Sequence, residues 1–268
     1  MRLTFCSCHR ANWAAPELGS GASRGPVSGG PVDRELLHDL MIGSRICAME
    51  NVFDAYGHLS MRHPHAPDRF LMTKSVAPAL ATVEDIVELD LSGHACEGET
   101  RPLFLERFIH GEIYRLRPDV NAIVHSHSPS VIPFSVTDVP MKAMFHTAAF
   151  IAEGVPVFDI WQHFGETDML IDNVEKGRAL AQALGSCSVC LMRAHGSVAV
   201  GPSVKHAVFR AVYTEINARL QKEAMGMSSN ISFLRVGEGA LADTVNIKGV
   251  SRPWDLWKTR VLRDLKAG

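Results

Sequence analysis

The sequence lacks both a long apolar run and a surplus of one charge. A membrane-spanning helix needs about 20 mostly apolar residues in succession, and no run in the 268 residues reaches that length. Lysine and arginine number 27, and aspartate and glutamate number 29, so the formal net charge at pH 7 is −2. Chains that bind nucleic acid or anionic membranes usually carry a basic surplus. We therefore expect neither nucleic acid nor a membrane as a partner.

Cysteine is scarce and scattered, which argues against a disulfide-stabilised secreted protein. The six cysteines are Cys6, Cys8, Cys47, Cys96, Cys187 and Cys190. A chain of this length with 46% apolar residues can bury a full core and needs no disulfides. The first residues also lack the apolar segment of a secretory signal. These features predict reduced thiols and a cytoplasmic location.

The first 31 residues differ in composition from the remainder of the chain. Ala, Gly, Ser and Pro dominate from residue 14 to residue 31, with little that could form a core. Residues 1–31 are therefore expected to be an N-terminal arm that packs on a neighbouring subunit, or a disordered tail. Residues 32–268 are expected to form a single domain.

Apolar periodicity predicts that helices and strands alternate along that domain. The expected helices cover residues 32–51, 106–116, 169–184, 203–223 and 254–265. The expected strands cover residues 59–62, 70–73, 87–91, 120–124, 154–158, 188–192, 197–200 and 231–236. Such alternation is typical of an α/β fold in which helices flank a central sheet.

The segment of residues 103–128 carries the strongest chemical signal. Its helix ends before Pro118, because the residue that precedes a proline is kept out of the helical conformation. An apolar strand over residues 120–124 follows and leads directly to His125 and His127. Residues two apart on a strand face the same way, so these two imidazoles are placed to bind one metal ion.

Glu106 and His195 complete the candidate centre. Glu106 opens the helix that precedes the two histidines, and His195 follows another apolar strand. Three imidazoles and a carboxylate suit a divalent transition metal with coordination positions left for a substrate. A second pair of the same spacing, His63 and His65, lies among prolines and charged residues. We expect that pair to be an exposed loop without a metal.

Further motifs accompany these ligands in a fixed order. They are Gly57-His58-Leu59-Ser60-Met61-Arg62, Thr73-Lys74-Ser75, Arg117-Pro118-Asp119, His195-Gly196 and Gly201-Pro202-Ser203 before an alanine-rich helix. From residue 33 to residue 225 the order resembles the class II aldolase/adducin family. The resemblance implies a three-layer α/β/α fold with a mixed central β-sheet, lyase activity, and a homotetramer with active sites at subunit interfaces. It also implies that the metal ligands are His125, His127, His195 and Glu106, and that Glu106 transfers the proton.

Three motifs depart from those of the sugar-phosphate members of the family, which hold a phosphate with an asparagine, a glycine and two serines. The corresponding residues here are His58, Val76 and the pair Phe104-Leu105. A phosphate clasp is thereby lost. An apolar wall beside an imidazole suits a flat aromatic ring instead. The loop of residues 163–170 resembles the decarboxylase branch of the family, whose members act on hydroxylated aromatic dicarboxylates.

This resemblance implies a carboxy-lyase that acts on 3-hydroxy-2-methylpyridine-4,5-dicarboxylate, in vitamin B6 degradation, or on a dihydroxyphthalate. The ring hydroxyl and a carboxylate would chelate the metal, and Glu106 would protonate the enolate-like carbon as CO2 leaves. Mn is the favoured metal, with Zn, Co or Fe as alternatives. The residues expected to contact the substrate are His58, Arg62, Lys74, Ser75, His146 and His163.

Two other functions are compatible with the same motifs. One is a class II aldolase or epimerase that acts on a sugar or a hydroxy-keto acid, although the altered phosphate motifs argue against a phosphorylated substrate. The other is a metal-free, adducin-like scaffold that uses the fold only for binding. The intact set of three histidines and a glutamate argues against the scaffold, because binding alone does not require these four side chains.

Overall fold

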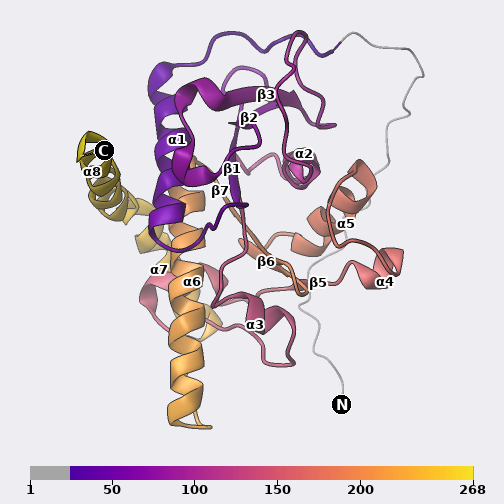
Figure 1. Ribbon diagram of the computed structural model, residues 1–268. Helices are drawn as coiled ribbons and strands as arrows, with labels where there is room; N and C mark the ends of the chain where they lie inside the picture. Colours follow the sequence, from indigo (N-terminus) through magenta and orange to yellow (C-terminus); the bar gives the residue numbers. More distant parts are fainter. Residues whose placement is uncertain (1–24, 268) are drawn as a thin grey trace.

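The computed structural model describes residues 25–267 and contains one seven-stranded sheet with helices on both faces (Figure 1). The strands are β1 His58–Arg62, β2 Arg69–Thr73, β3 Ile86–Asp90, β4 Ala122–Ser126, β5 Val157–Phe158, β6 Val189–Met192 and β7 Gly196–Gly201. Their order is β3-β2-β1-β4-β7-β6-β5. Neighbours are antiparallel except β5 and β6, which are parallel, so the sheet is mixed.

The helices belong to two layers. The α-helices are α1 Arg34–Met49, α2 Arg107–Leu116, α3 Ile132–Ser135, α4 Trp161–Phe164, α5 Val174–Leu184, α6 Val204–Met227, α7 Val236–Gly249 and α8 Ser251–Ala267, and the 3-10 turns are η1 Pro78–Leu80, η2 Val83–Asp85 and η3 His146–Ile151. In Figure 1, α1, α6 and α8 lie on one side of the strands, and α2 and α5 lie on the other. Among the described residues, none of the helices combines the length and apolarity that crossing a bilayer requires.

Alternation along the strands produces these layers. Successive side chains of a strand point to opposite faces. On β2, Leu71 joins the buried cluster shared with α1, α6 and α8, whereas Phe70 and Met72 join the cluster shared with α2 and α5. Burying each such side chain stabilises the fold by roughly 1.5–3 kcal/mol, so both faces of the sheet need a cover of helices. The predicted three-layer α/β/α fold with a mixed sheet is confirmed.

Helix boundaries follow local capping. Asp33 caps α1, because its carboxylate accepts a hydrogen bond of 2.8 Å from the amide of Glu35. The helix expected from residue 169 begins instead at Val174. Met169 has a φ of 69°, which a right-handed helix does not allow, and Asn173 caps the helix by accepting from the amide of Lys176. The loop before it contains the short helix α4, which the sequence did not indicate.

The strand expected over residues 231–236 is absent, and that prediction is wrong. The segment between α6 and α7 is irregular, and α7 begins at Val236. Its β-branched and aromatic residues favour a strand only where a neighbouring strand can pair with it. Within the described residues, one backbone hydrogen bond links this segment to another part of the chain, from the amide of Leu234 to the carbonyl of Ala143. One bond does not make a ladder.

The predicted N-terminal arm falls mostly on residues 1–24, which lie outside the described residues. Its last part lies along β3 of the same chain. The amide of Gly29 and the hydroxyl of Ser28 donate to the carboxylate of Glu88, at 2.6 Å and 2.7 Å. The amide of Glu97 donates to the carbonyl of Pro26. Residues 26–29 are therefore held by the exposed edge of the sheet.

Candidate metal centre

Three separate elements deliver the four candidate ligands to one place. His125 is in β4, and His127 follows directly after that strand. Glu106 is the residue that precedes α2. His195 lies in the tight turn between β6 and β7. The ligand atoms of the four residues all lie within 4.8 Å of one another.

The turn that carries His195 depends on its two neighbours. Ala194 has a φ of 54°, a left-handed conformation that costs a residue other than glycine roughly 1–3 kcal/mol. Gly196 lies against the carbonyl of Ser126, which a Cβ atom would approach to 2.1 Å. Only glycine therefore allows β7 to run this close to the end of β4. This close approach brings His195 beside His127, with 5.2 Å between their ring centroids.

Backbone carbonyls orient two of the three imidazoles. His125 Nδ1 lies 3.2 Å from the carbonyl oxygen of Ser197, and His195 Nδ1 lies 3.1 Å from that of Met169. A carbonyl oxygen only accepts, so each Nδ1 carries a hydrogen, and in the neutral ring Nε2 then presents a lone pair to the centre. The corresponding nitrogen of His127, Nδ1, has an acidic neighbour, because it lies 3.7 Å from a carboxylate oxygen of Asp54.

The donor atoms fit a divalent transition metal. Among the described residues, the buried Nε2 atoms of His125 and His127 have no hydrogen-bond partner. Leaving a buried polar atom without a partner costs roughly 1–3 kcal/mol, so such atoms point to a missing ligand. The Nε2 atoms of His125 and His195 each lie 3.4 Å from Glu106 Oε2. Three nitrogen lone pairs and one carboxylate oxygen therefore converge, as a metal site requires.

The surroundings set the charges of these groups. Burial alone would raise the pKa of Glu106, but His125 and His195 outweigh it and hold the pKa of the carboxylate well below its usual range. The other oxygen of this carboxylate, Oε1, accepts from the amide of Ile171 at 3.0 Å. Burial, with the neighbouring imidazoles, lowers the pKa of His127 to about 4. At pH 7 the centre therefore contains an ionised Glu106 and a neutral His127.

Of the predicted substrate residues, His58 lies beside the centre. Its ring centroid is 4.9 Å from that of His125 and 4.7 Å from that of Phe104. The backbone amide of Ser75 donates a hydrogen bond to the carbonyl of Pro102, two residues before Phe104. The ammonium group of Lys74 pairs with Asp85 at 2.9 Å. An imidazole and a phenyl ring thus form one wall next to the metal ligands.

The described chain does not bring Arg62, His146 or His163 to the centre. Arg62 lies at the other end of β1, where its guanidinium donates to four backbone carbonyls, those of Pro67, Tyr114, Arg117 and Val120. The His146 side chain is exposed, at the start of η3. The exposed ring of His163 stacks on Phe158, with centroids 5.4 Å apart.

Sequence reasoning overlooked His110. This residue is fully buried in α2 and lies 2.6 Å from His58. A usable signal was present, because Glu106, His110 and Tyr114 are spaced four apart and share one face of the helix. The expectation for His63 and His65 also needs correction. His65 is exposed, but His63 is only 2% exposed and contacts the carbonyl of Gly30, so it is a structural residue.

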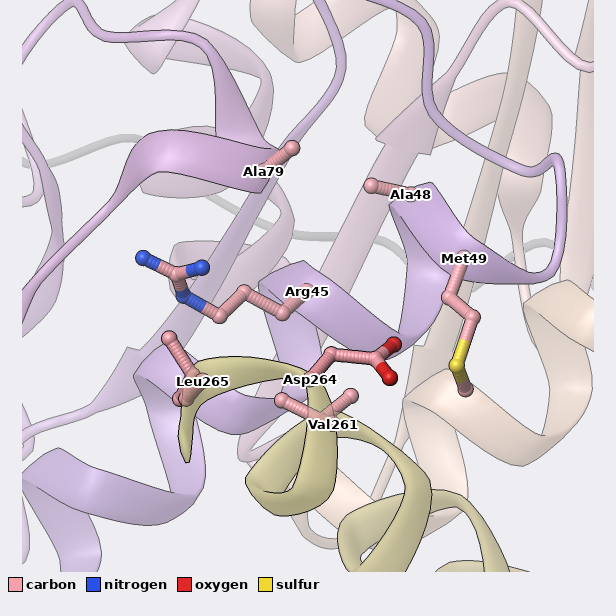
Figure 2. A pocket seen from close by; sticks show the side chains of 7 residues that line it. All are labelled: Arg45, Ala48, Met49, Ala79, Val261, Asp264 and Leu265. Atoms are coloured by element: carbon pink, nitrogen blue, oxygen red, sulfur yellow. The ribbon is translucent and has the colours of Figure 1, made fainter. Parts of the chain in front are cut away.

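The cavity in Figure 2 lies on the opposite side of the sheet from the centre. It encloses about 510 Å³ between α1 and α8. Its lining residues are Arg45, Ala48, Met49, Ala79, Val261, Asp264 and Leu265. It contains none of the candidate ligands, and its mostly apolar lining offers no set of metal-binding side chains.

Comparison with known proteins places these motifs in context. A family profile described as "Class II Aldolase and Adducin N-terminal domain" matches residues 42–222. Over 242 residues the chain is 36% identical to decarboxylase tropJ of Talaromyces stipitatus, covering 82% of this chain and 91% of the other. It is 26% identical over 239 residues to a 3,4-dihydroxyphthalate decarboxylase of Arthrobacter keyseri, covering 84% and 92%.

A solved structure agrees with the fold. An aldolase II superfamily protein from Pseudomonas syringae superposes with a TM-score of 0.71 at 21% identity, covering 86% of this chain and 93% of that one. This likeness concerns the arrangement of helices and strands alone.

Proposed function

The chain belongs to the class II aldolase and adducin family and is a lyase, and from that premise we propose that it is a metal-dependent decarboxylase of a hydroxylated aromatic acid. The observation that carries the proposal is the wall formed by His58 and Phe104 beside four converging ligands. An aromatic ring can lie against this wall while its oxygens reach the centre. Relatives named as decarboxylases, at 36% and 26% identity, support the same reaction.

The proposed substrate is 3-hydroxy-2-methylpyridine-4,5-dicarboxylate, as expected in vitamin B6 degradation. A dihydroxyphthalate is the alternative, which the name of one relative favours. We also propose Mn as the metal, a homotetramer with interfacial sites, and the cytoplasm as the location. Cys47 and Cys190 are buried free thiols, in keeping with a reducing compartment.

His125, His127, His195 and Glu106 would hold the metal. When bound, a divalent cation supplies a Lewis acid that stabilises negative charge on adjacent oxygens. The role of the histidines is to keep their Nε2 lone pairs aimed at one point, which the carbonyls behind His125 and His195 ensure. Glu106 adds a carboxylate oxygen in the same place, close enough to a bound substrate to exchange a proton with it.

Glu106 moves the proton in this proposal. Its carboxylate is ionised and can therefore accept the hydrogen of the ring hydroxyl when the substrate binds, and a bound cation would make that hydroxyl more acidic. It then returns that hydrogen to the ring carbon that bears the leaving carboxylate. The C–C bond breaks, its electron pair remains on the ring, and CO2 departs. The ring oxygen finally regains a proton from solvent. Ile171 holds Oε1 throughout, which keeps Oε2 aimed at the substrate.

The test is CO2 release by metal-stripped protein that has been reloaded with Mn, Zn or Co. The panel contains 3-hydroxy-2-methylpyridine-4,5-dicarboxylate, 3,4-dihydroxyphthalate and 4,5-dihydroxyphthalate. We expect that one compound of the panel releases CO2 and that it does so only when metal is present. Glu106→Gln, which keeps the size of the side chain, should lose this activity. Metal uptake without CO2 release would favour an aldolase or epimerase, whereas failure to bind metal would favour the scaffold.

A further inference from the structure

Four buried side chains form an unbroken hydrogen-bonded row beneath α2. Tyr114 Oη lies 2.7 Å from Ser60 Oγ, which in turn lies 2.6 Å from His110 Nδ1. On the other side of its ring, His110 Nε2 lies 2.6 Å from His58 Nδ1. None of the four residues is more than 3% exposed. The row therefore ends at His58, the residue whose ring packs against that of His125.

The two imidazoles of the row share one hydrogen, because His58 Nδ1 and His110 Nε2 lie only 2.6 Å apart. A neutral imidazole carries a hydrogen on one nitrogen and a lone pair on the other. Each histidine of the row consequently donates on one side and accepts on the other, so the row has a direction.

The hydroxyl of Tyr114 sets this direction. Within the described chain, Ser60 is its only hydrogen-bond partner. If His58 donated to His110, then Ser60 would donate to Tyr114, and the phenol hydrogen would be buried without an acceptor. In the opposite direction Tyr114 donates to Ser60, Ser60 to His110 and His110 to His58. The one hydrogen left for a partner outside the row is then on His58 Nε2, in the ring that packs against His125. An unpaired buried donor disfavours the first arrangement by about fivefold or more.

We propose that this row holds His58 in the tautomer with its hydrogen on Nε2, so that His58 donates a hydrogen bond to an anionic oxygen of the substrate. Tyr114, Ser60 and His110 are then positioning residues that act through His58. The tautomer follows from the row alone, whereas the substrate, an aromatic carboxylate, rests on the proposed function. The Phe104 ring beside His58 supplies a flat apolar surface next to this donor.

Nitrogen NMR of the imidazoles tests the tautomer without any substrate. The sample is zinc-loaded protein labelled with ¹⁵N-histidine, and the His58 signals are assigned by their loss in His58→Gln. We expect hydrogen on Nε2 and a bare Nδ1. Hydrogen on Nδ1, or a ring protonated on both nitrogens at pH 7, overturns the proposal.

A second spectrum tests whether the row is the cause. In His110→Gln, the amide can either donate to His58 Nδ1 or accept from it, so the direction is no longer set. We expect both His58 tautomers in this variant. A single, unchanged tautomer would show that the row does not hold His58. If the variant does not fold, the wild-type spectrum still decides the tautomer.

Kinetics test the role of His58 as a donor, using the panel substrate that releases CO2. His58→Met removes the donor, and loss of a hydrogen bond to a charged oxygen raises KM about tenfold or more. His58→Gln keeps an N–H donor at similar reach, and we expect it to restore most of the affinity. Equal KM values for the two variants overturn the donor role. Absence of CO2 release from the whole panel refutes the proposed function instead, and leaves the NMR result to decide the tautomer.

Discussion

Gly196→Ala perturbs the close contact that brings His195 to the centre. The new Cβ would lie 2.1 Å from the Ser126 carbonyl oxygen and 3.2 Å from Cδ2 of His127, whereas ordinary contacts are 3.4–4 Å. The clashing atom, the Ser126 carbonyl oxygen, belongs to the backbone, so no change of side-chain rotamer can relieve the clash. The strands β4 and β7 must therefore separate by more than about 1 Å. Overpacking of this kind lowers the free energy of unfolding by about 1–3 kcal/mol. The shift of His195 should also weaken zinc binding by about 10- to 100-fold.

Urea unfolding at a fixed protein concentration and competition with a chromophoric zinc chelator measure the two effects. The matched control is Gly226→Ala, near the end of α6, where an added Cβ would meet nothing within 4 Å. Alanine is the better helix former, so the control should gain up to about 1 kcal/mol and keep its zinc affinity. The reasoning fails if the two variants behave alike.

Three further predictions concern stability. Zinc at about 100 times its Kd should stabilise the stripped protein by about 2.7 kcal/mol, a rise in Tm of roughly 5–11 °C by calorimetry, and no rise would argue against a preformed site. The pKa of His110 falls from 6.5 to about 3 on folding. The contribution of His110 to the free energy of unfolding is therefore fully present above pH 6.5, and it is lost as the pH falls toward 3, by about 1.4 kcal/mol per pH unit. Urea unfolding should show that His110→Gln reduces the slope of the free energy of unfolding between pH 6.5 and pH 4.5 by about this amount, while the other buried histidines keep their share. Arg62→Ala should cost about 2–3 kcal/mol of unfolding free energy with little change in KM, because Arg62 binds backbone carbonyls. A raised KM at unchanged stability would restore Arg62 as a substrate residue.

The sequence was sufficient to select four side chains that the structure brings together, because each stands next to a helix or strand that its local sequence defines. His125 and His127 follow a short apolar strand, and a strand fixes which way two alternate residues point. His195 was recognisable from its own strand and the glycine after it. The structure brings these residues together with Glu106, as the sequence predicted. The layers were equally readable, since strand alternation fixes two buried faces.

The substrate residues were harder to predict because they depend on contacts between distant segments. Arg62 belongs to the same sequence motif as His58, but the two residues lie at opposite ends of β1. His110 was missed because its partners, His58 and Ser60, come from another strand altogether. The prediction of a strand over residues 231–236 was wrong for the same reason, since a strand needs a neighbouring strand to pair with, and the local sequence does not reveal one.

The measurement that tests the central claim most directly is CO2 release and metal content in one sample. Stripped protein is reloaded with Mn and given 3-hydroxy-2-methylpyridine-4,5-dicarboxylate or 3,4-dihydroxyphthalate labelled with ¹³C in its carboxylates. The proposed function predicts one metal ion per chain and labelled CO2 only from the reloaded protein, with none from Glu106→Gln. Equal release from stripped and reloaded protein, or no release with the metal fully bound, would contradict it.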